Sequence, residues 1–209
     1  MFRFSVTELV GCPYFSRAKL FKPEMEFALT YGKQKHEEVE SLLAGLGLHV
    51  EIPIELELEI DGYEVVIAGR IDAMNPMKGY IYEIKSKNLT TRGVRQLFLY
   101  RDMLYVLTGK LWKPAFILYH GSGYTIIDSF LYTPEPLEVL NEVSKLIWRL
   151  IRDRSIRVEC EDCRVCALYP NCIPDYRFIG ERLLEYRPSW LHKVKPRCSL
   201  RQSLLVGKP

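Results

Sequence analysis

The sequence predicts an α/β domain in which helices cover a mixed β-sheet. Two observations predict this fold class. The spacing of apolar residues changes from a helical period to a period of two, and a strand follows a helix that itself follows three meandering strands, which implies a mixed sheet. The length of 209 residues suits one domain, and 48% hydrophobic with 26% charged residues suits a buried core under a hydrated surface.

The chain is expected to begin with helices. Ser5 or Thr7 can cap a short helix, Thr7–Val10. Pro13 can open a second helical segment, because proline is tolerated in a first turn. The residues of Glu24–Leu43 have apolar side chains at approximate helical spacing, and glycines that follow can end this long helix.

Three strands are then predicted. In Ile52–Ile60, apolar residues alternate with glutamates, which is typical of a strand with one buried and one wet face. The Asp61-Gly62 pair is a hairpin signal, so Tyr63–Met74 should be the partner strand. A turn at Asn75–Gly79 leads to the third strand, Tyr80–Lys85.

The second half predicts a helix, two strands and a helix. Thr90–Leu107 should be helical and closed by Gly109. Two apolar runs, Ala115–Tyr119 and Tyr124–Tyr132, read as strands, and Pro134 opens a helix to about Arg152.

Charge and hydropathy set limits on function. The net charge of +3 and a pI near 8.5 permit nucleic-acid binding without arguing for it. Basic residues do crowd positions 149–157 and 193–201. No apolar run reaches the ~18 residues of a membrane helix, and the first residues lack a signal-peptide core, so we expect a cytoplasmic protein without membrane contact.

A carboxylate–lysine constellation lies on two neighbouring predicted strands. Asp72 should face Glu83 across the hairpin, and Lys85 should share the face of Glu83 because side chains alternate along a strand. Two carboxylates with the backbone carbonyl of Ile84 would make a Mg²⁺ or Mn²⁺ site, where a bound water becomes the nucleophile. Lys85 would position that water or stabilise charge on a phosphate. The alternative is an ordinary salt bridge between strands.

Three further polar residues flank this constellation. His36 lies on the long helix, and an imidazole ligand suits Mn²⁺ or Fe²⁺ better than Mg²⁺. Gln96 and Tyr100 are four residues apart and so share one helix face. The alternative is that these residues have no role in a site; His36, for example, would then be an ordinary surface histidine.

The cysteines predict a metal or cluster site. Cys163-x-x-Cys166 followed by Cys172 supplies three thiolates for zinc or an iron–sulfur cluster. Either nearby Cys160 or distant Cys12 can be the fourth ligand. A zinc knot without chemistry is the alternative, and Cys198 has no predicted role.

Taken in order, the motifs resemble the RecB-like CRISPR-associated nucleases, the fourth Cas family, of the PD-(D/E)XK superfamily. The matched residues run from Ser5 to Cys172 and are Ser5-x-Thr7-Glu8-Leu9, Cys12-Pro13, His36, Gly69-x-x-Asp72, Glu83-x-Lys85, Gln96-x-x-x-Tyr100 and Cys163-x-x-Cys166-x5-Cys172. The resemblance implies a restriction-endonuclease-like core and a Mg²⁺- or Mn²⁺-dependent DNA exonuclease, usually active on single strands. It also implies that the protein processes prespacers for the Cas integrase.

The resemblance also implies roles and boundaries. The metal ligands would be His36, Asp72, Glu83 and the Ile84 carbonyl. Lys85 would be the catalytic lysine, and Gln96 and Tyr100 would be the helix motif. A [4Fe–4S] cluster would be held by Cys12, Cys163, Cys166 and Cys172. The chain 1–209 would then be one nuclease domain, with a core at about 24–152, an Fe–S staple made by 5–23 and 153–175, and a C-terminal tail at 176–209.

Two other functions remain open at this point. The same motifs and cysteine staple occur in the AddB and RecB type of recombination and repair nucleases, although this chain has no Walker A pattern. A non-catalytic Fe–S DNA-binding subunit is the third interpretation. It does not explain why Asp72, Glu83 and Lys85 are all present, since burying them is costly.

Overall fold

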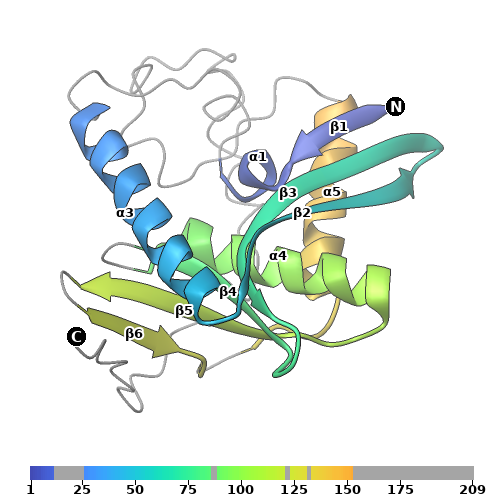
Figure 1. The fold of residues 1–209 in the computed structure, drawn as a ribbon. Helices are drawn as coiled ribbons and strands as arrows, with labels where there is room; N and C mark the ends of the chain where they lie inside the picture. The colour runs from blue at the N-terminus through green and yellow to red at the C-terminus, as the bar shows by residue number, and fades with distance from the viewer. Residues whose placement is uncertain (12–25, 86–88, 121–122, 131–132, 153–209) are drawn as a thin grey trace.

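The computed structural model describes residues 1–11, 26–85, 89–120, 123–130 and 133–152 (Figure 1). These residues form one six-stranded sheet with helices on both faces, so the predicted α/β class with a mixed sheet is confirmed. The strands are β1 Phe2–Ser5, β2 His49–Ile60, β3 Tyr63–Asn75, β4 Tyr80–Lys85, β5 Lys113–His120 and β6 Gly123–Ile127. They run in the order β1-β3-β4-β5-β6, and β2 pairs with β3 outside this path.

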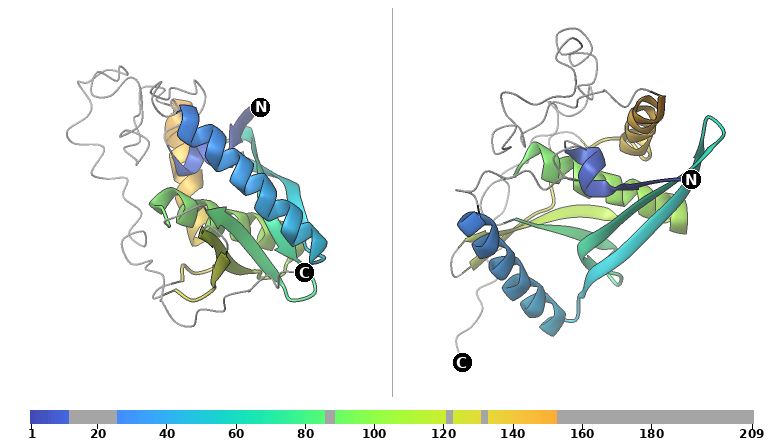
Figure 2. Two further views of the ribbon diagram at one scale, coloured as in Figure 1. Left: turned by 60° about the vertical axis from the view of Figure 1, so that its left-hand side comes forward. Right: turned by 90° about the horizontal axis from the view of Figure 1, so that it is seen from above.

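The helices form a layer on each face of the sheet. They are α1 Val6–Val10, α3 Glu26–Gly45, α4 Thr91–Thr108 and α5 Glu138–Arg152. Figure 2, seen from above, places α3 on one side of the sheet and α4 and α5 on the other. Two apolar cores match these layers. Val39 and Leu43 of α3 pack against Ile84 and Ile117 on one face, and the larger core lies between the opposite face and α1, α4 and α5.

Strand β1 was not predicted. It pairs in parallel with β3, Phe2 with Val65 and Ser5 with Ala68. Ser5 then caps α1: the Glu8 backbone N–H donates to the Ser5 hydroxyl, and the Glu8 carboxylate accepts from the Ser5 backbone N–H. Ser5 is therefore the cap, and Thr7 lies within the helix.

A fork between β3 and β4 is the feature that positions the site. The two strands pair only where Ala73–Asn75 meets Tyr80–Tyr82, close to their turn. Nearer the start of β3, at Val65–Ala68, the same edge of β3 pairs with β1 and not with β4. The backbone of Gly69–Asp72 therefore faces an opening between β1 and β4.

Local chemistry explains most of the turns and helix ends. Asp61 and Gly62 both have positive φ, 53° and 77°, as a two-residue hairpin turn requires. Gly109 closes α4 in the left-handed conformation, with its N–H bonded to the Tyr105 carbonyl. No helix among the described residues is long and apolar enough to span a membrane.

Three predicted boundaries were wrong by three residues or more. β2 begins at His49 and not at Ile52. β6 ends at Ile127 and does not run on to residue 132. α5 begins at Glu138, because the carbonyls of Pro134 and Glu135 accept hydrogen bonds from the buried Arg101 guanidinium. The helical segment expected after Pro13, the cysteine-rich segment and the tail at 176–209 lie outside the described residues, so their boundaries stay predictions.

Candidate metal centre

Asp72 lies at the opening of the fork, where two other elements reach its carboxylate. The backbone N–H of Ile84 donates to Oδ2 of Asp72 at 2.8 Å, which replaces a ladder bond that the diverging strands have lost. Nε2 of His36, from α3, lies 3.1 Å from the same oxygen. In an extended strand the N–H and C=O of one residue point to the same side, so the Ile84 carbonyl also faces the fork. The structure thus brings the His36 imidazole, the Asp72 carboxylate and the Ile84 backbone together.

Glu83 and Lys85 form an ion pair beside Asp72. Glu83 is only 1% exposed, and burial raises the pKa of its carboxyl to about 7 despite the neighbouring ammonium of Lys85. Burial lowers the pKa of Lys85, but the carboxylates of Glu83 and Asp72 outweigh it and the net shift is upward. Among the described residues, Oε2 of Glu83 has no hydrogen-bond partner, so this buried carboxylate has one coordination position free.

Glu40 joins the centre and was missed by the sequence analysis. One ligand atom each from His36, Glu40 and Asp72 lie within 4.8 Å of one another; Glu83 is not part of this group. Nδ1 of His36 is 2.9 Å from Oε1 of Glu40, close but out of line for a hydrogen bond. The available signal was the spacing, because residues four apart on a helix share a face.

Histidine protonation follows from these neighbours. Burial lowers the pKa of His36, but the carboxylates of Asp72 and Glu40 outweigh it, and the net shift is upward. Burial, followed by a hydrogen bond with Glu51, raises the pKa of Glu40 to about 7. A cation bound at these groups would therefore compete with their protons.

Glu51 has an unusual backbone at this point. It lies opposite Asp72 in the β2–β3 register, between the pairs Val50–Ala73 and Ile52–Ile71, and has φ 55°. A non-glycine residue in this region costs on the order of 1–3 kcal/mol and persists only where its surroundings hold it. Here the side chain is held by an ion pair with Arg70 and by the hydrogen bond with Glu40.

Tyr100 and Gln96 approach from α4, on the other face. The Arg70 backbone N–H donates to the Tyr100 hydroxyl at 3.0 Å, so this side chain closes part of the open β3 edge. Burial raises the pKa of Tyr100 well above its ordinary value, although hydrogen bonds from Arg70 and with Gln96 act in the opposite direction. The predicted helix pair thus lies next to the carboxylates, with Tyr100 bracing β3.

Two glycines make room for these side chains. A Cβ on Gly69 would lie 2.6 Å from Cε1 and 2.7 Å from the hydroxyl of Tyr100. A Cβ on Gly93, in the first turn of α4, would lie 2.8 Å from Cε of Lys85. Gly69 of the Gly-x-x-Asp motif therefore has a packing role that the motif alone did not show.

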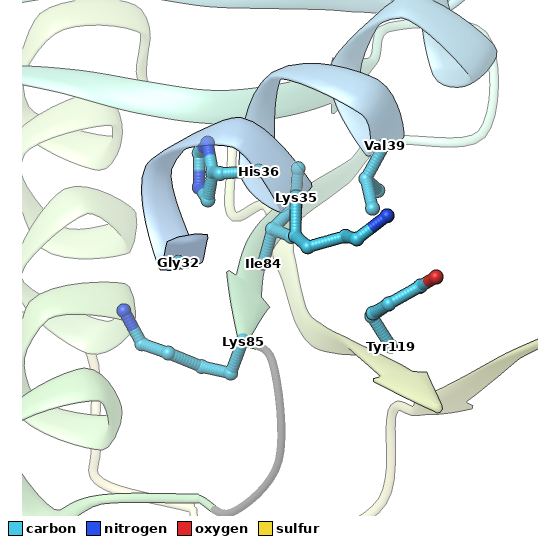
Figure 3. Close-up of a pocket in the computed structure, with 7 residues that line it drawn as sticks. All are labelled: Gly32, Lys35, His36, Val39, Ile84, Lys85 and Tyr119. Atoms are coloured by element: carbon cyan, nitrogen blue, oxygen red, sulfur yellow. The ribbon is translucent and has the colours of Figure 1, made fainter. Parts of the chain in front are cut away.

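A cavity of about 190 Å³ adjoins the centre. His36 and Lys85 line it, together with Lys35 and Tyr119 on the side of β5 (Figure 3). The cysteines predicted as cluster ligands, Cys12, Cys163, Cys166 and Cys172, lie outside the described residues, as do Cys160 and Cys198.

The donor set fits a hard divalent cation. Carboxylate oxygens and a backbone carbonyl suit Mg²⁺ and Mn²⁺, and the imidazole nitrogen favours Mn²⁺. A buried lysine next to such a cation could stabilise negative charge on a bound anion.

Comparison with known proteins supports the fold alone. No protein-family model matches the sequence, and no curated protein matches it. Among solved structures, the chain is similar to the crystal structure of SSO0001, with a TM-score of 0.59 and 22% sequence identity. The similarity covers 82% of this chain and 86% of that chain, so the two share a fold over most of their lengths.

Proposed function

We propose that this protein is a metal-dependent DNA exonuclease of the PD-(D/E)XK type that acts on single strands and processes prespacers in CRISPR adaptation. The observation that carries the proposal is the convergence of His36, Asp72, Glu83 and Lys85 at the fork. Within the described part of the chain, Oε2 of Glu83 is buried without a partner, and the carboxylates of Glu40 and Asp72 gather around the His36 imidazole. Such a set of buried groups is costly unless protons or a cation complete it.

The residues have distinct tasks in phosphodiester hydrolysis. Asp72, Glu83 and the Ile84 carbonyl supply oxygen ligands, and His36 supplies nitrogen. A divalent cation bound there would neutralise phosphate charge and lower the pKa of the attacking water. Lys85 stabilises the charge that grows on the phosphate oxygens, and Glu40 offers a further carboxylate oxygen within 4.8 Å of the ligand atoms of His36 and Asp72.

The proposal includes a [4Fe–4S] cluster held by Cys12, Cys163, Cys166 and Cys172. One feature supports this long-range ligand set. The chain leaves the described part at Gly11, directly after α1, and at Arg152, the last residue of α5, and these two helices contact each other. The proposed partners are single-stranded or frayed DNA and the Cas integrase.

The test is DNA degradation. End-labelled single- and double-stranded DNA is incubated with Mn²⁺, Mg²⁺ or Ca²⁺ and either wild type, Asp72→Ala or Lys85→Met. We expect Mn²⁺ to support cleavage at least as well as Mg²⁺, Ca²⁺ not to support it, and Lys85→Met to reduce the rate by about 10²–10³-fold. Glu57→Ala, which removes an exposed carboxylate on β2, is the matched control and should cleave normally.

Full activity of Asp72→Ala would show that the catalytic assignment is wrong. Adding the integrase distinguishes adaptation from general repair. A prespacer nuclease should trim frayed DNA to integrable lengths in its presence, whereas a repair nuclease should be indifferent to it.

A further inference from the structure

The cavity beside the metal centre has one wall that the proposed chemistry does not use. Lys35 projects from α3 and Tyr119 from β5, and both line the cavity with His36 and Lys85. Figure 3 shows the Lys35 and Lys85 ammonium groups pointing to opposite sides of Ile84, with His36 between them. A ligand bound at the metal centre would therefore have an ammonium group on either side, from Lys35 and from Lys85.

Lys35 is held in this wall by aromatic rings. Its Nζ lies 5.8 Å from the ring centroids of both Tyr31 and Tyr119. Its side chain is 23% exposed, whereas that of Lys33 on the same helix is 80% exposed. Lys35 also pairs with Glu38 at 2.6 Å, but Glu38 is itself largely exposed, and such a pair exchanges readily for another anion.

Tyr119 presents a supported aromatic ring. It is half-buried and packs against Tyr124, with ring centroids 5.6 Å apart. The cavity volume of about 190 Å³ is below the roughly 300–1,000 Å³ of pockets for drug-sized ligands, which suits one planar ring system better than a larger molecule.

The cavity wall also includes a glycine of α3. Gly32 lies within α3 and lines the cavity, and a Cβ added there would meet nothing within 4 Å. A glycine inside a helix costs about 0.5–1 kcal/mol relative to alanine, so its presence has no local structural advantage.

We propose that Lys35 and Tyr119 bind the nucleotide adjoining the scissile phosphate, with its base stacked on Tyr119 and its phosphate on Lys35. Single-stranded nucleic acid is recognised by this combination of a stacking ring and a cation. The inference rests on the proposed nuclease function and adds a substrate subsite to it.

The test measures binding without cleavage. Each variant is made in the Asp72→Ala background, and fluorescein-labelled single-stranded DNA is titrated in Ca²⁺ and followed by anisotropy. Tyr119→Leu should weaken binding by about 5-fold or more, and Tyr119→Phe should restore it, because the ring supplies the stacking. Lys35→Met should reduce the slope of log affinity against log salt by about 0.7, whereas the matched Lys33→Met should not.

A scan with abasic sites identifies the subsite directly. One base is omitted at successive positions of the DNA. A single omission should weaken binding to the Tyr119 protein and have no effect on Tyr119→Leu, a result that general loss of folding cannot produce. If every omission affects both proteins equally, the subsite assignment is wrong while the nuclease proposal stands. If the Asp72→Ala protein binds no DNA and the wild type cleaves none, both proposals fail.

Discussion

At the scale of single residues, burial determines which carboxylates can hold a proton at neutral pH. Glu83 is the clearest case, because it is almost fully buried and its only described partner is Lys85. Its pKa is raised from 4.5 to about 7, with burial as the main cause. A carboxyl with a raised pKa stabilises the fold while protonated, and that contribution is lost as pH rises through the folded value.

The stability of the protein in EDTA should therefore fall between pH 4.5 and pH 7. Glu83 should contribute on the order of 3 kcal/mol to this fall. Glu83→Gln, which cannot ionise, should lack that contribution, so its free energy of unfolding should decline less over the same range. Urea denaturation of both proteins at several pH values measures the free energy of unfolding as a function of pH. Identical pH profiles would show that Glu83 does not titrate in this window.

The residues at the centre were partly predictable from the sequence. The sequence identified three of them, Asp72, Glu83 and Lys85. Both strands that carry them were predicted, and strand alternation puts Glu83 and Lys85 on the same face. Glu40 and Glu51 were not found, because their place depends on how α3 and β2 lie against β3. The position of these two side chains depends on the tertiary structure, and neither residue belongs to a short sequence motif.

At the scale of secondary-structure elements, α4 and β3 approach closely because Gly69 has no side chain. Gly69→Ala should destabilise the protein by about 1–3 kcal/mol, since Cβ would collide with the Tyr100 ring. Gly45→Ala is the matched control, because a Cβ there meets nothing within 4 Å. Thermal denaturation compares the two. Equal melting temperatures would show that Tyr100 can move without cost.

The contact of α4 with α5 depends on a buried ion pair. Asp102 accepts from the Arg101 guanidinium and from the backbone N–H groups of Val139 and Leu140 at the start of α5. Its side chain is fully buried, so removal leaves an uncompensated cation.

Asp102→Ala should therefore cost about 3–5 kcal/mol of stability, measured by urea denaturation. Glu55→Ala, which removes an exposed ion pair with Arg3, should change stability little. If the two variants unfold at the same urea concentration, the Asp102 network does not hold α5.

Element prediction succeeded where the signal was local. β4 was predicted with its observed bounds, and Thr90 and Gly109 cap α4 as their residue types suggest. β1 was missed because Phe2–Ser5 is short and pairs only with Val65–Ala68, far along the chain. α5 began later than predicted because Arg101 binds the carbonyls of Pro134 and Glu135.

At the scale of the whole molecule, the proposed cluster would join the two ends of the domain. A link from Cys12 to Cys163 closes a loop of about 150 of the 209 residues, and it restricts the unfolded state more than a local knot would, because loop-closure entropy grows with loop length. This difference separates the two possible ligand sets.

Protein purified without oxygen should be brown and lose colour with dithionite, whereas zinc would leave it colourless. Cys12→Ser should lose iron and stability together, and Cys160→Ser should keep both. Visible absorbance, iron content and melting temperature measure this. Colour lost with Cys160→Ser but kept with Cys12→Ser would indicate a local four-cysteine cluster.

The parallel pairing of β1 with β3 also has a consequence for biosynthesis. The ribosome makes β1 before β3, and the partner residues Val65–Ala68 emerge only after α3 and β2 have been synthesised. The β2–β3 hairpin, closed by Asp61 and Gly62, needs only local contacts and can form before β1 joins it. Until then, Phe2 and Phe4, which pack in the larger core of the folded protein, remain exposed on the nascent chain.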